Sequence, residues 1–140
     1  MAPTESHVVN TPLKLRTIRI GTPAKRGDGL RIGTTRRPPR GVPKARWARD
    51  GYFDVWLPAL APSVKLLSRL RSRDLEDPAG WKWFFDSYER ELLGNAESRQ
   101  NVELVARIAQ RIPISVGCFC ADESRCHRSR LYEIILRYEL

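Results

Sequence analysis

The sequence predicts a single α/β domain, in which a short and mainly parallel sheet is flanked by helices. The length of 140 residues and the hydrophobic fraction of 41% suit one domain with one core. Strand-like and helix-like patterns are interspersed in the order strand, strand, helices, strand, helix, which is typical of layered α/β folds. No internal repeat of about 20–50 residues divides the chain. We therefore expect residues 1–12 to form a loose N-terminal tail and residues 13–140 to form the domain.

Two strands are predicted at the start of the domain. Over residues 13–20, aliphatic and β-branched side chains are interleaved with basic ones, which is the pattern of a half-buried strand. Gly21 follows it and favours a turn. A Gly-Asp-Gly turn at residues 27–29 then leads into a second predicted strand over residues 30–35.

Three amphipathic helices are expected to follow these strands. The first covers about residues 62–71, with a serine near its start as the N-cap. The second begins at residues 77–78, where Asp suits the N-cap and Pro suits the first turn, and it ends at Gly94. The third covers roughly residues 97–111 and stops before Pro113. The apolar stripe of the second helix consists of Trp81, Phe84, Phe85, Tyr88 and Leu92.

The last predicted strand and helix frame a segment that holds all three cysteines and one of the two histidines. Residues 114–118 indicate a short buried strand, and apolar residues at helical spacing follow from Leu131 onward. Cys126, His127 and Arg128 therefore fall at the start of a helix, where unpaired N–H groups favour an anion and stabilise a thiolate. We predict Cys126 and His127 as catalytic residues and Arg128 as a ligand-binding residue.

Each of these three assignments has an alternative. Covalent catalysis by Cys126 also requires an aligned base and a cradle for the reacting anion, and a sequence does not show geometry. His127 could act as a proton carrier or only cap the loop. Arg128 could pair with Asp122 or Glu123 at the surface instead of binding a ligand.

Zinc-binding side chains also gather in this segment, but their spacing argues against a metal site. Cys118 and Cys120 belong to the predicted strand region, and strand residues two apart have side chains roughly 6.5–7 Å apart, too far for one tetrahedral ion. Adjacent Cys126 and His127 would also need to converge on that ion. We therefore expect no bound metal and name no cofactor. A thiol redox sensor that uses Cys118, Cys120 and Cys126 is kept as an alternative function.

Several classes of protein have no support in the sequence. Neither a Walker phosphate loop nor a dinucleotide glycine fingerprint occurs. No stretch resembles a signal peptide or a membrane-spanning helix. An odd number of cysteines, two of them only two positions apart, predicts free thiols and a reducing compartment. We expect a cytoplasmic protein without membrane contacts.

The excess positive charge lies in the N-terminal third. Residues 1–50 hold 12 Lys or Arg and three acidic residues, whereas residues 51–140 hold 13 of each sign. The arginines of the loop after the second strand are separated by prolines, which restrict the backbone. We predict that Arg36 and Arg40 bind a phosphorylated small molecule or nucleotide. The alternatives are a non-catalytic accessory protein that binds nucleic acid, and a basic loop that is only solvated.

The arginine loop and the cysteine-containing loop both follow predicted strands. If these strands are parallel neighbours, the two loops lie at the same edge of the sheet, where ligands of α/β proteins bind. The sequence therefore predicts one anion-binding pocket that Arg36, Arg40, Cys126, His127 and Arg128 frame together.

From about Thr17 to its end, the chain resembles the domain of unknown function 488 family, which includes YeaO-like proteins. The resemblance rests on the arginine loop at residues 36–41, the helix start at residues 60–63, Asp77-Pro78 with the aromatic stripe after it, and Cys126-His127-Arg128. It implies a single α/β domain in a cysteine-bearing branch of the family. The chain has Thr35 where the family often has an acidic residue and Pro38 where it often has a tryptophan.

Overall fold

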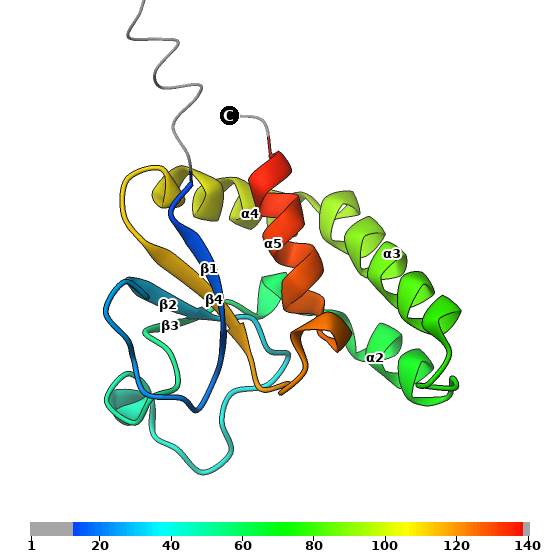
Figure 1. Cartoon of the computed structure of the whole chain (residues 1–140), viewed down its shortest axis with the longest axis horizontal. Helices are drawn as coiled ribbons and strands as arrows, with labels where there is room; N and C mark the ends of the chain where they lie inside the picture. Colours follow the sequence, from blue (N-terminus) through cyan, green and yellow to red (C-terminus); the bar gives the residue numbers. More distant parts are fainter. Residues whose placement is uncertain (1–12, 139–140) are drawn as a thin grey trace, which may run out of the picture.

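A computed structural model describes residues 13–138 of the chain (Figure 1). The predicted tail, residues 1–12, lies outside the described residues. Four short strands and four α-helices build an α/β domain, as predicted. Three turns of 3-10 helix cover Lys44–Arg46, Pro58–Leu60 and Glu123–Arg125. The strands and helices are β1 (Leu15–Arg19), β2 (Leu30–Gly33), β3 (Val55–Trp56), α2 (Val64–Arg71), α3 (Pro78–Gly94), α4 (Ala96–Ala109), β4 (Ile114–Cys118) and α5 (His127–Arg137).

The four strands form a parallel sheet in the order β1-β4-β2-β3. The last strand in the sequence is thus inserted between the first two, and Ile114 of β4 lies opposite both Leu15 of β1 and Leu30 of β2. All five residues of β4 are buried, which matches the continuous apolar character expected of a central parallel strand. This order makes the carboxyl ends of β2 and β4 direct neighbours.

The four α-helices lie on one side of the sheet, and the core fills the space between them and the strands (Figure 1). Ile32, Ile114 and Val116 project from the sheet into this core. Their helical partners include the fully buried side chains of Tyr88 and Leu131. Burial of this apolar surface is the main contribution to the stability of the fold.

The helix starts follow the predicted capping signals. The Ser63 side chain accepts a hydrogen bond from the backbone N–H of Leu66 at 3.0 Å, and Asp77 caps α3 through the N–H of Ala79 at 3.0 Å. Helix α4 starts one residue earlier than predicted, because Asn95 accepts from the N–H of Ser98 and serves as its N-cap. It also ends two residues early, at Ala109 rather than at residue 111.

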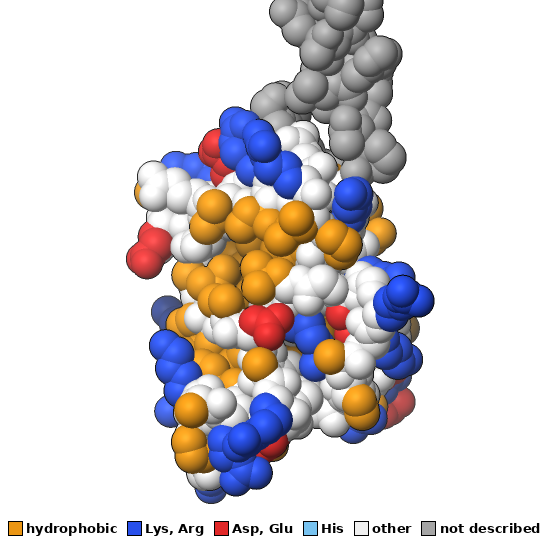
Figure 2. All heavy atoms as spheres, turned by 90° about the vertical axis from the view of Figure 1, so that its left-hand side faces the viewer, with side chains coloured by type: hydrophobic (Ala, Val, Ile, Leu, Met, Phe, Trp, Pro, Cys, Tyr) orange, Lys and Arg blue, Asp and Glu red, His pale blue; other side chains and the backbone are white. Residues whose placement is uncertain are grey.

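Loops rather than helices cover the other side of the sheet. Phe53 packs against Gly33 of β2, where an added Cβ would overlap its ring. Next to it, the buried Arg31 lies 3.7 Å from the carboxylate of Asp28. Figure 2 shows this side of the molecule, with hydrophobic side chains gathered in its upper half and basic side chains around them. Within residues 13–138, no helix is both long and apolar enough to cross a bilayer.

Candidate functional site

The two loops singled out in the sequence do leave the sheet side by side. Because β2 and β4 are parallel neighbours, Thr34 after β2 lies beside Gly117 of β4. The backbone N–H of Thr34 donates to the Gly117 carbonyl at 2.9 Å, and its hydroxyl donates to the same oxygen at 3.0 Å. The predicted adjacency of the arginine loop and the cysteine-containing loop is therefore confirmed.

His127 joins these two loops from the first turn of α5. Its Nε2 lies 2.8 Å from the Thr34 carbonyl oxygen and 3.0 Å from the Thr34 hydroxyl. Because a carbonyl only accepts, Nε2 carries the proton, and the bare Nδ1 lies 3.9 Å from the Sγ of Cys126. Burial against Tyr88, whose ring centroid is 5.4 Å away, lowers the pKa of His127 from 6.5 to about 4. His127 is therefore neutral at physiological pH and fixed in one tautomer.

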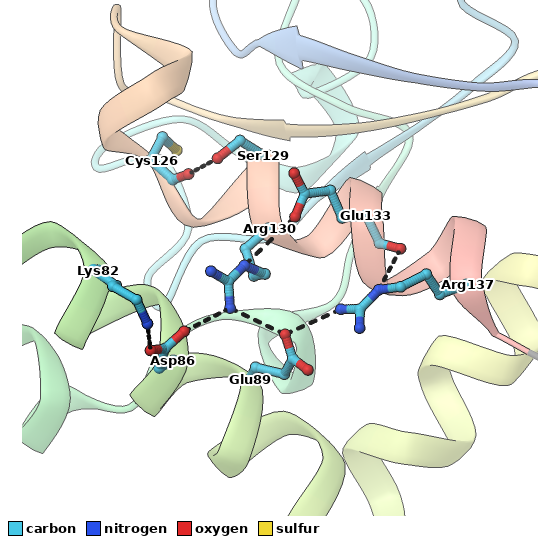
Figure 3. Close-up of polar contacts among 8 residues, drawn as sticks. All are labelled: Lys82, Asp86, Glu89, Cys126, Ser129, Arg130, Glu133 and Arg137. Carbon is cyan, nitrogen blue, oxygen red and sulfur yellow. Dashed lines mark hydrogen bonds and ion pairs between the residues drawn. The ribbon is translucent and has the colours of Figure 1, made fainter.

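Ion pairs join helix α5 to α3 (Figure 3). Arg130 reaches from α5 between two acidic side chains of α3, at 3.1 Å from Asp86 and 3.1 Å from Glu89. Arg137, two turns further along, is also 3.1 Å from Glu89. Hydrogen bonds from Lys82 and Arg130 lower the pKa of Asp86, which keeps it ionised. These pairs add to the packing of Leu131, Ile134 and Ile135 in the core, which places α5 and hence the three residues at its start.

The three cysteines converge at the carboxyl end of β4. Their Sγ atoms all lie within 4.8 Å of one another, and those of Cys118 and Cys120 are 3.9 Å apart. All three are free thiols. The expected separation of Cys118 and Cys120 was wrong because β4 ends at Cys118, so the chain is no longer extended where Cys120 follows.

The three thiols of this cluster differ in pKa. Hydrogen bonds from the Cys118 and Cys126 thiols, with the field of nearby Arg128, lower the pKa of Cys120. Interaction with the neighbouring sulfurs and burial raise the pKa of Cys126, and hydrogen bonding with Cys120 raises that of Cys118. The expectation that the helix start makes Cys126 the favoured thiolate is therefore wrong. The negative charge is favoured at Cys120, the exposed member of the cluster.

Arg128 is buried beside this cluster with only 4% of its surface exposed. Its Nη1 donates to the Cys120 carbonyl oxygen at 2.7 Å, and its Nε has no hydrogen-bond partner among the described residues. The alternative pairing with Asp122 or Glu123 is not seen within the described part of the chain. A buried guanidinium is stable only beside a negative charge or hydrogen-bond acceptors, and among the described residues it has the Cys120 carbonyl.

Arg36 and Arg40 lie in a separate surface groove of about 440 Å³. Arg36 is fixed there by hydrogen bonds of 3.1 Å to the carbonyls of Pro62 and Ala61. None of the described residues that line the groove is acidic, and its four arginines form no ion pair with any described residue. We call it the arginine groove; its lining residues are Thr35, Arg36, Arg37, Pro38, Arg40, Val64, Leu67, Arg71 and Phe119.

The structure thus divides the predicted site residues into two groups. Arg36 and Arg40 line the arginine groove, whereas Cys126, His127 and Arg128 do not line it and are buried at the start of α5. Phe119 connects the groups, because it lines the groove and stands between Cys118 and Cys120 in the chain. Sequence reasoning missed Phe119, and it missed Arg71 because a basic residue at the end of an amphipathic helix carries no distinguishing signal.

Comparison with protein families agrees with this architecture. A family model described as "Active DUF488-N3 subclade" matches residues 15–139. No curated protein sequence and no solved structure matched the chain. The match covers both the arginine loop and the cysteine cluster, and nearly all of the chain. The chain therefore belongs to the domain of unknown function 488 family, in the subclade that this model describes.

Proposed function

We propose that the chain binds a phosphorylated small molecule or nucleotide in the arginine groove. The observation that carries the proposal is the clustering of four arginines, none of them in an ion pair with a described residue, in a groove whose described lining residues include no acid. Guanidinium groups recognise phosphate through two parallel hydrogen bonds, which makes arginine well suited to this ligand class. An uncompensated cationic groove attracts anions before contact is made.

The apolar part of the groove favours an organic phosphate over a bare anion. Val64 is 53% exposed and Phe119 is 41% exposed, although both are large hydrophobic residues. They share the groove with Pro38 and Leu67. An aromatic ring beside guanidinium groups suits a ligand that combines a planar base with a phosphate, because the base can stack while the phosphate is bound.

The arginine loop is held by hydrogen bonds of its own, which supports a binding role. The Thr35 hydroxyl donates to the Arg37 carbonyl at 2.7 Å, and the Trp56 indole donates to the Thr35 carbonyl at 2.8 Å. Together with the two bonds from Arg36, these contacts order the loop in the described structure. A preordered loop loses less conformational entropy on binding than a flexible one.

Cys126 and His127 retain a role in this proposal, but not in contact with the ligand. Both are buried, and Cys126 is only 2% exposed. The thiol nearest to a ligand in the groove would be that of Cys120, the exposed neighbour of Phe119. We therefore assign His127 as a positioning residue, which holds the loop through its contact with Thr34, and Cys126 as its neighbour, with Sγ 3.9 Å from the Nδ1 of His127.

The binding proposal is tested by a thermal-shift screen of nucleotides and phosphorylated metabolites, followed by titration calorimetry of the best compound. A ligand that binds the folded state raises the melting temperature. Arg71→Ala is expected to weaken binding by about tenfold or more, because a charge-assisted hydrogen bond is lost. Arg69→Ala is the matched control, since Arg69 is exposed on the same helix and does not line the groove.

If the wild type, Arg71→Ala and Arg69→Ala bind the compound with equal affinity, the arginine groove is not the binding site. Binding that requires an oligonucleotide, and that falls equally when Arg46 or Arg49 is neutralised, would instead support the nucleic-acid alternative. Each result separates the arginine groove from the rest of the basic N-terminal third.

A further inference from the structure

We propose that Cys118, Cys120 and Cys126 form a three-thiolate site for a divalent zinc ion, with a fourth position open. The proposal starts from the three Sγ atoms, which all lie within 4.8 Å of one another. Three cysteines that come together from a strand end and a helix start, with no disulfide between them, match the ligand type that zinc prefers. Hard cations such as Mg²⁺ and Ca²⁺ prefer oxygen ligands and do not suit this cluster.

The separation of the sulfurs is close to that of a zinc site. With Zn–S bonds of about 2.3 Å, two sulfurs of a tetrahedral site lie roughly 3.8 Å apart. The Sγ atoms of Cys118 and Cys120 are 3.9 Å apart, and Cys126 lies within 4.8 Å of both. All three sulfur separations therefore lie within about 1 Å of the value for one tetrahedral ion.

Arg128 provides the second, independent observation. It is buried at 4% exposure, it has no ion-pair partner among the described residues, and its Nε–H has no hydrogen-bond acceptor there. Three thiolates around Zn²⁺ carry a net charge of minus one, which the guanidinium balances. A monovalent ion such as Cu⁺ would leave the partly buried assembly with an extra negative charge, so charge balance favours the divalent ion.

The protein supplies only three ligands to the proposed ion. His127 does not complete the set, because its Nε2 is hydrogen-bonded to Thr34 and its Nδ1 adjoins Cys126 alone of the three sulfurs. No further Cys, His, Asp or Glu atom joins the group in the described chain. Zinc sites with three protein ligands leave a position for water or substrate. The exposure of Cys120 puts the open side of the cluster toward solvent.

Metal binding replaces protons at the sulfurs. Three Zn–S bonds form, and every sulfur that is still a thiol releases its proton to solvent, so no oxidant or reductant is required. Zinc affinity is therefore expected to rise with pH. The inference does not depend on the arginine groove, and Arg71→Ala is expected to bind zinc as the wild type does.

The test is elemental analysis of the reduced full-length chain, combined with titration of Co²⁺ as a spectroscopic probe. We expect one zinc per chain, and a thiolate-to-cobalt charge-transfer band that saturates at one equivalent. Cys120→Ser should lose both signals while keeping the fold, because Cys120 is exposed. Arg128→Met should weaken zinc affinity by about 10–100-fold, the usual loss for a group just outside the ligands. Ser124→Ala, in the same loop, is the control and should bind zinc normally.

Two outcomes would overturn the zinc site. The first is a folded, reduced chain that takes up neither zinc nor cobalt. The second is a Cys120→Ser variant that binds zinc as tightly as the wild type. If the reduced chain takes up no zinc and instead forms a disulfide between two of these cysteines under mild oxidation, the redox-sensor alternative would replace the metal site.

Discussion

Replacing Gly29 with Ala is expected to reduce the free energy of unfolding by about 3 kcal/mol, from overpacking and from a positive φ angle. Gly29 has φ of +64°, and a Cβ at this position would overlap the backbone carbonyl group of Pro113. That carbonyl accepts the hydrogen bond from the N–H of Leu30 at 3.0 Å, which begins the pairing of β2 with β4. The substitution therefore acts on the contact that brings the arginine loop next to the cysteine cluster.

Gly41→Ala separates the two causes of this loss. Gly41 has φ of +73°, but no atom outside its chain neighbours lies within 4 Å of the added Cβ. It should lose only about 1 kcal/mol, the cost of a left-handed conformation without a clash. Urea unfolding of both variants provides the measurement. Equal losses at Gly29 and Gly41 would contradict the close approach of β2 and β4.

The domain is expected to lose about 3 kcal/mol of stability through His127 alone as the pH falls from 6.5 to 4. Burial lowers the pKa of His127 from 6.5 to about 4 in the folded chain. Between these values the unfolded chain binds a proton that the folded chain does not, so acid favours unfolding. The contribution is complete above about pH 6.5 and is lost progressively down to about pH 4.

His127→Gln removes the titrating group while keeping a side-chain N–H that can donate to Thr34. Unfolding free energies of both proteins are measured from pH 4 to 7 with a metal chelator present. Carboxylates with lowered pKa values, such as Asp86 and Asp122, also reduce stability as the pH falls, and they do so equally in both proteins. The difference between the two curves gives the contribution of His127 to the free energy of unfolding at each pH. A difference that does not change with pH would show that the imidazole is not buried in its neutral form.

Local signals in the sequence predicted most of the helices because their caps are local. Ser63 and Asp77 mark helix starts through hydrogen bonds with residues a few positions away, and α3 ends at Gly94 as predicted. Strand β3 was missed because two residues are too few to show an alternating pattern. The parallel pairing of β2 with β4 could only be stated as a hypothesis from the sequence. It depends on contacts between residues more than 80 positions apart.

The candidate site was less predictable because it depends on where the backbone bends. Cys118 and Cys120 were expected to project from the same side of an extended strand, roughly 6.5–7 Å apart, and the end of β4 at Cys118 brings their sulfurs together instead. Burial of Arg128 likewise depends on the packing of α5, which the helical spacing of its apolar residues does not specify. Arg36 and Arg40 were recognised by composition, but their neighbour Arg71 enters the groove only through the tertiary fold.

The arginine groove is tested most directly by NMR of arginine side-chain Nε–H groups during titration with the compound that stabilises the chain most. The resonances of Arg37, Arg40 and Arg71 are expected to shift together and to saturate, because their guanidinium groups line the groove and would bind the phosphate. The Arg69 resonance should not move. Shifts confined to Arg46 and Arg49, with those of Arg40 and Arg71 unchanged, would contradict anion binding in the groove.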